Sequence, residues 1–148
     1  MKRTILLLVV LLCAVPLLSQ EINFINGLTG KSSVTFDDGF RMYMYVLRKA
    51  PGGFEANVRA LKGMNLLKAD RYEATRPFRR GMLALMVARH LKLKGSLLYL
   101  MFDTRRYAHR ACVGERIMAV DTSEWDKLTG DELIEVMAIV SERMEGEK

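Results

Sequence analysis

Apolar side chains recur along this chain at the spacing of an α-helix, and breaks that contain glycine or proline separate the runs. Members of the first run fall at i, i+4, i+7, i+8 and i+11, on one helix face: Phe36, Phe40, Tyr43, Met44 and Leu47. Strand-like alternation is rare, and no Asn-Gly or Asp-Gly pair joins two strand-like runs. The sequence therefore predicts an all-α fold.

Residues typical of helix ends flank these apolar runs. Thr35 and Thr104 stand where an N-cap is expected, because a threonine hydroxyl can accept a hydrogen bond from a free backbone N–H. Thr129 and Glu132 have the spacing of a capping box at the start of the last run. Gly63 and Gly114 are expected to end the two shorter helices.

One pattern occurs twice, over residues 54–92 and 104–145. Each unit has a short helix, a glycine, an extended linker and a long helix, and a shift of 50 residues places Leu83 on Leu133. Neither unit can bury its apolar stripes alone, so we expect the two to pack together. With 148 residues the chain suits one core, and residues 35–148 are predicted as a single helical domain that begins with an N-terminal helix.

The repeat resembles the S-layer homology family. The segment 60–64, Ala-Leu-Lys-Gly-Met, is similar to the end of that family's short helix. The segment 78–89 fits the register of the motif that opens its long helix, Leu128-Thr129-Gly130-Asp131-Glu132 offers a second copy, and Phe36-Asp37 resembles the opening of a repeat. The resemblance implies a fold of two packed helix pairs that carry S-layer-homology-like repeats.

The family's polar Thr-Arg-Glu set, which helps to bind cell-wall polysaccharide, is incomplete in both units. The first unit keeps only the arginine, as Arg80, and has Arg79 and Met82 at the other two places. The second keeps Thr129 and Glu132, with glycine in place of arginine. The family commonly has three repeats, whereas this chain shows two. The resemblance therefore supports the fold more than it supports polysaccharide binding.

The first 20 residues have the layout of a secretory signal peptide. Lys2 and Arg3 precede an apolar run from Ile5 to Leu18, which is shorter than the about 20 residues of a membrane-spanning helix. Polar residues follow, and cleavage is expected to leave a chain that starts near Gln20 or Glu21. A lipoprotein signal at Cys13 is disfavoured because a leucine stands directly before it.

These features predict an exported protein of the periplasm or cell envelope, which meets a membrane only through an uncleaved signal segment. Residues 21–34 contain Gly27 and Gly30 among small polar residues, and we expect them to form a flexible leader.

Charge is distributed unevenly along the exported chain. Residues 41–116 hold 17 basic and 5 acidic side chains, whereas residues 117–148 hold 3 basic and 9 acidic ones. Two explanations remain open: the basic segment meets an anionic partner, or the acidic tail folds back and neutralises it. Nucleic acid is not expected as the partner of an exported protein.

The residues that catalysis or metal binding requires are missing from the pattern. The chain has two histidines, His90 and His109, and neither belongs to a metal-binding spacing. Cys112 would be the one cysteine left after export, and its apolar neighbours indicate a buried, inert thiol. The sequence predicts no enzyme activity, no catalytic residue, no cofactor and no metal.

The candidate binding residues are five arginines near predicted helix starts: Arg79, Arg80, Arg105, Arg106 and Arg110. A helix N-terminus carries partial positive charge, so cations there suggest a bound anion. The competing explanation is neutralisation by the tail carboxylates Glu142, Glu145 and Glu147. The sequence thus favours a non-enzymatic binding or protein-interaction module whose partner is an envelope protein or an anionic envelope glycan. The alternative is S-layer-homology-like anchoring to anionic cell-wall polysaccharide.

Overall fold

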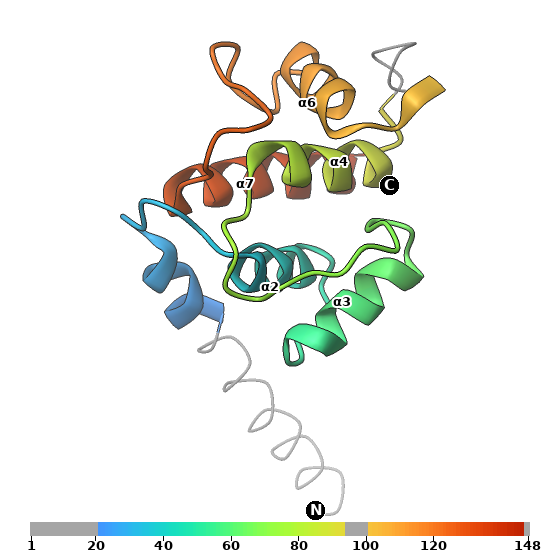
Figure 1. The fold of residues 1–148 in the computed structure, drawn as a ribbon. Coiled ribbons are helices and arrows are strands. Elements are labelled where there is room, and N and C mark those ends of the chain that lie inside the picture. The colour runs from blue at the N-terminus through green and yellow to red at the C-terminus, as the bar shows by residue number, and fades with distance from the viewer. Residues whose placement is uncertain (1–20, 94–100, 147–148) are drawn as a thin grey trace, which may run out of the picture.

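The computed structural model describes residues 21–93 and 101–146, so the expected signal peptide lies outside the described residues. The named helices are α2 (Phe36–Val46), α3 (Phe54–Gly63), α4 (Arg80–His90), α6 (Arg105–Gly114) and α7 (Gly130–Gly146) (Figure 1). Residues 21–28 are also helical. This part of the chain contains isolated β-bridges but no strand, which confirms the all-α fold class. None of its helices has the length and apolar character needed to cross a membrane.

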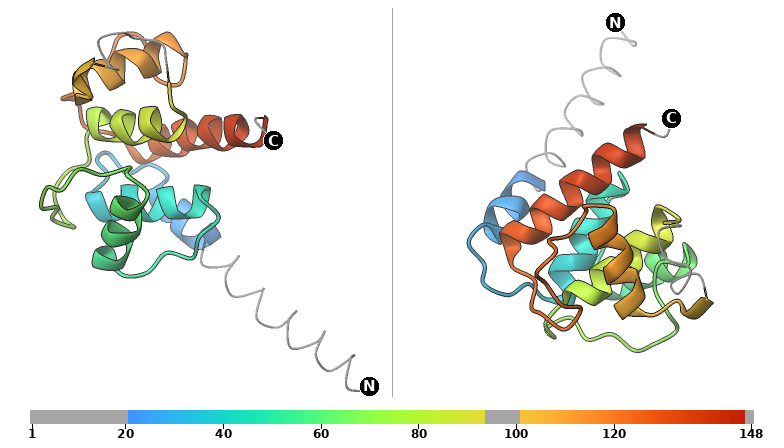
Figure 2. Two further views of the ribbon diagram at one scale, coloured as in Figure 1. Left: turned by 90° about the vertical axis from the view of Figure 1, so that its right-hand side faces the viewer. Right: turned by 90° about the horizontal axis from the view of Figure 1, so that it is seen from above.

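The helices stack in three levels, with α6 above α4 and α7, and with α2 and α3 beneath them (Figures 1 and 2). Helix α4 occupies the middle of this stack. Its residues Gly81 to Ala88 are all buried, so this helix is covered on every side. Leu83 of α4 and Leu133 of α7 belong to one continuous core, as packing of the two units requires.

Residues 21–34 differ from the expected flexible leader. They form a helix at 21–28 that lies beside the start of α7 (Figure 2), and both Leu28 and Val34 are buried. The Arg41 guanidinium lies 4.5 Å from the centre of the Phe24 ring, which joins this helix to α2. The segment is therefore part of the helical domain.

The same backbone contact joins three helix starts in a ring. Phe36 N donates to Arg76 O at 3.0 Å, Arg80 N to Asp126 O at 3.2 Å, and Gly130 N to Lys31 O at 2.8 Å. Each contact ties the start of a long helix to the segment that precedes the next long helix in the ring. The structure therefore adds a third unit, formed by residues 21–28 and α2, to the two units found in the sequence.

The helix ends follow the predicted capping at their N-termini and differ at their C-termini. Thr35 and Asp38 form a complete capping box, and Thr104 Oγ1 accepts from Tyr107 N. Gly63 is the last residue of α3 and not its cap, because the left-handed position falls on Asn65, with φ 58°. Arg116, with φ 57°, has the same place after α6.

Candidate ligand-binding surface

Three of the five candidate arginines meet around one surface depression of about 490 Å³. We call it the arginine hollow, and its lining residues are Lys68, Asp70, Arg79, Thr104, Arg105, Arg106, Glu124 and Trp125. They come from the linker before α4, the first turn of α6 and the loop before α7. Residues from both predicted units therefore contribute to one site.

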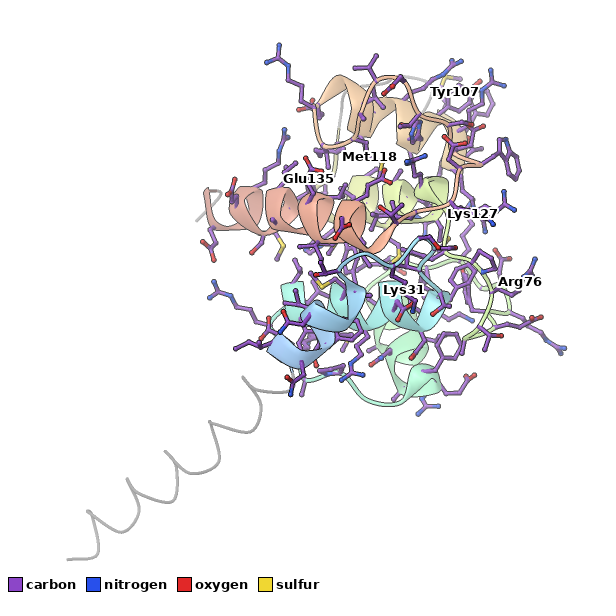
Figure 3. The ribbon with its side chains drawn as sticks, turned by 90° about the vertical axis from the view of Figure 1, so that its left-hand side faces the viewer. Lys31, Arg76, Tyr107, Met118, Lys127 and Glu135 are labelled. Carbon is purple, nitrogen blue, oxygen red and sulfur yellow. The ribbon has the colours of Figure 1, made fainter. Side chains whose placement is uncertain are left out.

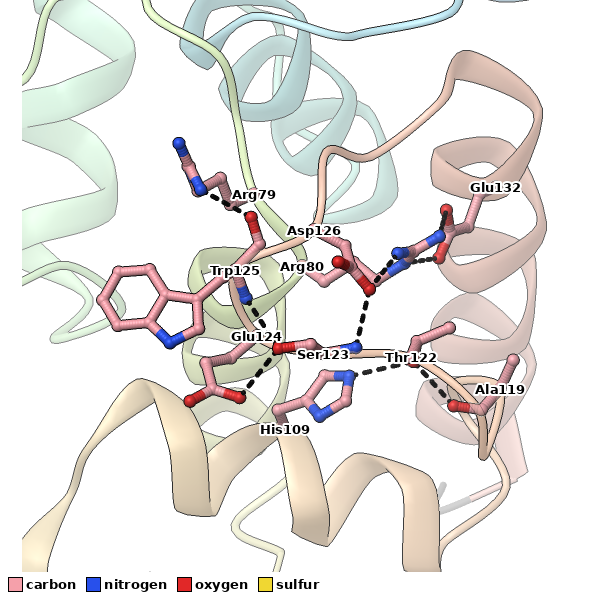
Figure 4. A network of polar contacts seen from close by, with 10 residues as sticks. All are labelled: Arg79, Arg80, His109, Ala119, Thr122, Ser123, Glu124, Trp125, Asp126 and Glu132. Carbon is pink, nitrogen blue, oxygen red and sulfur yellow. Dashed lines mark hydrogen bonds and ion pairs between the residues drawn. The ribbon is translucent and has the colours of Figure 1, made fainter.

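Local structure explains why these arginines point to one place. Thr104 caps α6, so Arg105 and Arg106 lie in its first turn, and both are exposed. Arg79 precedes α4 in extended conformation, and its backbone forms an isolated antiparallel β-bridge with Lys127. Its Nη1 donates to the Trp125 carbonyl oxygen at 2.6 Å, which fixes Arg79 against the loop before α7 (Figure 4).

Arg80 does not belong to this surface, contrary to the sequence-based hypothesis. Its side chain is only 16% exposed and forms a two-point ion pair with Glu132, with Nη2 2.7 Å from Oε2. Asp126 lies 2.9 Å from Nη1 and completes the contact (Figure 4). The hydrogen bond with Glu132 raises the pKa of Arg80 above its usual value. Arg80 therefore joins α4 to α7.

The same contact changes the predicted role of Glu132. Its backbone N–H donates to Thr129 Oγ1 at 3.2 Å, so the threonine half of the capping box is present. The Glu132 carboxylate binds Arg80.

Arg110 lies outside the arginine hollow and lines a second depression of about 520 Å³. We call it the histidine hollow, because His109 also lines it. Arg106, Glu124 and Trp125 border both depressions. Four of the five candidate arginines thus lie along one continuous surface, and Arg80 lines neither depression.

The acidic segment 117–148 neutralises Arg80 through Asp126 and Glu132, but its last carboxylates do not pair with the candidate arginines within the described residues. Glu145 pairs with Arg48, and Glu142 makes no ion pair with any candidate arginine within the described residues. Glu147 lies outside them. Figure 3 shows Glu135 on α7 well away from Lys127 and Arg76, which lie toward the other side. Arg79, Arg105 and Arg106 are exposed at the arginine hollow, where Asp70 and Glu124 are the neighbouring carboxylates.

Trp125 is a candidate binding residue that the sequence analysis missed. It is the chain's single tryptophan, and its side chain is 66% exposed at the border of both hollows. Its position in a polar loop, outside any helical stripe, is the signal that could have marked it. Its aromatic ring lies beside the cationic groups of both hollows, where it can pack against a bound ligand.

Each histidine has a hydrogen-bond partner, and the described cysteine is buried. His90 Nδ1 lies 3.1 Å from the Tyr43 hydroxyl, and His109 Nε2 lies 3.1 Å from Thr122 Oγ1. Cys112 is buried as predicted, and burial raises the pKa of its thiol to about 12. In residues 21–93 and 101–146, no three histidine, cysteine or carboxylate side chains could hold a metal ion.

Comparisons of the chain with protein-family models, with curated proteins and with solved structures find no match. The S-layer homology resemblance therefore stays a prediction.

Proposed function

We propose that this protein is an exported, non-enzymatic binding module of a bacterial cell envelope, and that it binds an anionic ligand at the arginine hollow. The observation that carries the proposal is the meeting of Arg79, Arg105 and Arg106 at one depression beside the exposed Trp125. The export part of the proposal is supported by the signal-peptide layout of residues 1–20.

The chemistry of these groups favours an anion. Guanidinium groups bind carboxylate, phosphate or sulfate through paired hydrogen bonds. The first-turn N–H groups of α6 add partial positive charge on the same side. Trp125 supplies an aromatic face against which a sugar ring or another flat group can pack. Asp70 and Glu124 also line the hollow and can accept hydrogen bonds from neutral hydroxyl groups of the same ligand.

The alternative function is anchoring to anionic cell-wall polysaccharide in the manner of S-layer homology proteins. The ring of three equivalent helix starts supports it, because the resemblance places its motif at two of these starts. Arg80 and Glu132, which occupy motif positions, bind each other, and this weakens the case. A pull-down with purified cell walls, compared with soluble anionic glycans, separates the two functions.

The experiment measures binding of the protein to sulfated, phosphorylated and neutral glycans of equal length at low and high salt. We expect binding to the charged glycans alone, weakened by salt because screening reduces the attraction. Arg79→Ala combined with Arg105→Ala should abolish it. Arg59→Ala is the matched control, since Arg59 is exposed on α3 and does not line the hollow. Equal binding by the double variant, or no salt-sensitive binding by the wild type, would disprove the proposal.

A further inference from the structure

The loop of residues 119–126, which carries Trp125, is held from two sides. On the α4 side, Gly81 N donates to Glu124 O at 3.0 Å and Arg79 Nη1 donates to Trp125 O at 2.6 Å. On the α6 side, His109 Nε2 lies 3.1 Å from Thr122 Oγ1 (Figure 4). Among the described residues, this is the one hydrogen bond between the loop and α6.

The direction of that hydrogen bond follows from the neighbouring groups. The Thr122 hydroxyl donates its single proton to the Ala119 carbonyl oxygen at 2.7 Å. Towards His109 it can therefore only accept, so Nε2 carries the proton and donates. Ser123 continues the chain of contacts, because its Oγ accepts from the Trp125 N–H at 3.3 Å. His109 is thus linked through Thr122 and Ser123 to Trp125.

Building on the proposed function, we infer that His109 is a positioning residue that holds the Trp125 loop in place when neutral and releases it when protonated. His109 as a whole residue is only 4% exposed, so a charged imidazole there would lack hydration. Movement of residues 119–123 away from α6 would admit water to the ring. Proton binding therefore favours the open loop, in proportion to the difference in proton affinity between the two states.

Burial sets the sign of this effect, and the charges around His109 modify its size. Burial is the largest influence and lowers its pKa, and Arg80 of α4 lowers it further. Glu124 and Asp126 of the loop and Glu132 of α7 act in the opposite direction, but the pKa remains below the ordinary 6.5. Arg106 and Arg110 of α6 line the same hollow. The docked loop is therefore stable above about pH 6.5 and is weakened as the pH falls below it.

The affinity for the ligand should depend on whether the loop is docked. Trp125 and Glu124 border the arginine hollow, so an anion bound there contacts the loop in its docked position. Arginine stays charged throughout the pH range of a histidine titration. An anionic ligand of constant charge should thus bind more tightly at pH 7.5 than at pH 5.0, and this dependence should disappear without His109.

The first test uses Trp125 as a reporter, because it is the chain's single tryptophan. Its fluorescence and its quenching by acrylamide are followed from pH 7.5 to 5.0. We expect one transition with a midpoint below 6.5 in the wild type and none in His109→Gln, whose amide N–H can replace the Nε2 donor without titrating. His90→Gln, which alters the other histidine, should keep the transition. A flat wild-type curve, or the same transition in His109→Gln, overturns the inference.

Thr122 provides a second variant pair if His109→Gln does not fold. Thr122→Val removes the hydroxyl and should show the low-pH fluorescence already at pH 7.5. Thr122→Ser keeps the hydroxyl and should behave as the wild type. Wild-type fluorescence and a wild-type pH curve in Thr122→Val would overturn the inference.

The second test measures binding of dextran sulfate, whose sulfate esters stay charged over this range. We expect affinity to fall about 3- to 10-fold between pH 7.5 and 5.0 in the wild type and to stay constant in His109→Gln, a modest coupling between two sites. Equal affinity at both pH values overturns the coupling. A fluorescence transition without any dextran sulfate binding overturns the proposed ligand and leaves the positioning role of His109 standing.

Discussion

At the scale of single residues, Arg80 shows why a charged side chain cannot be assigned a role from its neighbours in sequence. It follows Arg79 directly, yet one side chain borders the arginine hollow and the other is half-buried against Glu132, 52 residues away. The sequence marks both as cations near a helix start. Which carboxylate comes within reach depends on how α7 packs, and that long-range contact is not visible in a local pattern.

Arg80→Ala should therefore reduce stability, whereas Arg79→Ala should not. Removal of one partner leaves the Glu132 carboxylate half-buried without its cation, at a cost of roughly 2–4 kcal/mol, somewhat less than for a fully buried pair. Arg79 is exposed, so its loss should change the free energy of unfolding by less than about 0.5 kcal/mol. Urea denaturation measures both. Equal stability of the two variants would contradict the assigned role of Arg80.

At the scale of elements, the helices predicted from apolar periodicity are present, and the errors have local causes. The sequence predicts a flexible leader at 21–34 because glycine and asparagine obscure the spacing of Phe24, Ile25 and Leu28. The capping of α2 and α6 by threonine was predictable, since those contacts span three residues. Trp125 could not be placed, because the conformation of its loop depends on contacts with α4 and α6.

The start of α7 should tolerate no side chain at position 130. A Cβ on Gly130 would lie 1.8 Å from the Leu28 carbonyl oxygen, which is backbone and cannot rotate away. Gly130→Ala should therefore destabilise the protein by about 1–3 kcal/mol or more, as overpacking does. Thermal unfolding measures the loss.

Gly63→Ala is the control for that substitution. Apart from its chain neighbours and the backbone of its own helix, no described atom lies within 4 Å of a Cβ at this position, and alanine favours the helical conformation of α3. Stability should stay equal or rise slightly. If Gly130→Ala were equally harmless, helix 21–28 would not be docked against α7 as described.

At the scale of the whole molecule, three units that share one ring of helix starts explain why no unit has a core of its own. The first residue of each long helix donates a backbone hydrogen bond to the segment that precedes the next long helix. Helix α4 is covered on every side by the rest of the domain. The sequence revealed two units by direct comparison. The third was hidden because its first helix was assigned to the leader, directly after the expected signal peptide.

Export should remove residues 1–20 before this assembly forms. Intact-mass measurement of the protein from the periplasm or culture medium should give a chain that starts near Gln20 or Glu21, because the apolar run ends at Leu18 and polar residues follow. Lys2→Glu with Arg3→Glu should slow processing, since the basic start of a signal peptide supports export. A secreted form that still begins with Met1 would contradict the predicted export route.

The shared core predicts one cooperative unfolding transition. Leu83 and Leu133 occupy equivalent places in two units, and both are fully buried in the same core. Leu83→Ala and Leu133→Ala should each cost about 2–5 kcal/mol, the usual range for a core leucine. Each substitution should lower the midpoint temperature of one single transition, which calorimetry and helical circular dichroism should report at the same temperature. A single transition is expected because each helix start in the ring is hydrogen-bonded to the next unit, so the loss of one unit disrupts the others. Two separate transitions, each sensitive to only one substitution, would show instead that the units fold independently.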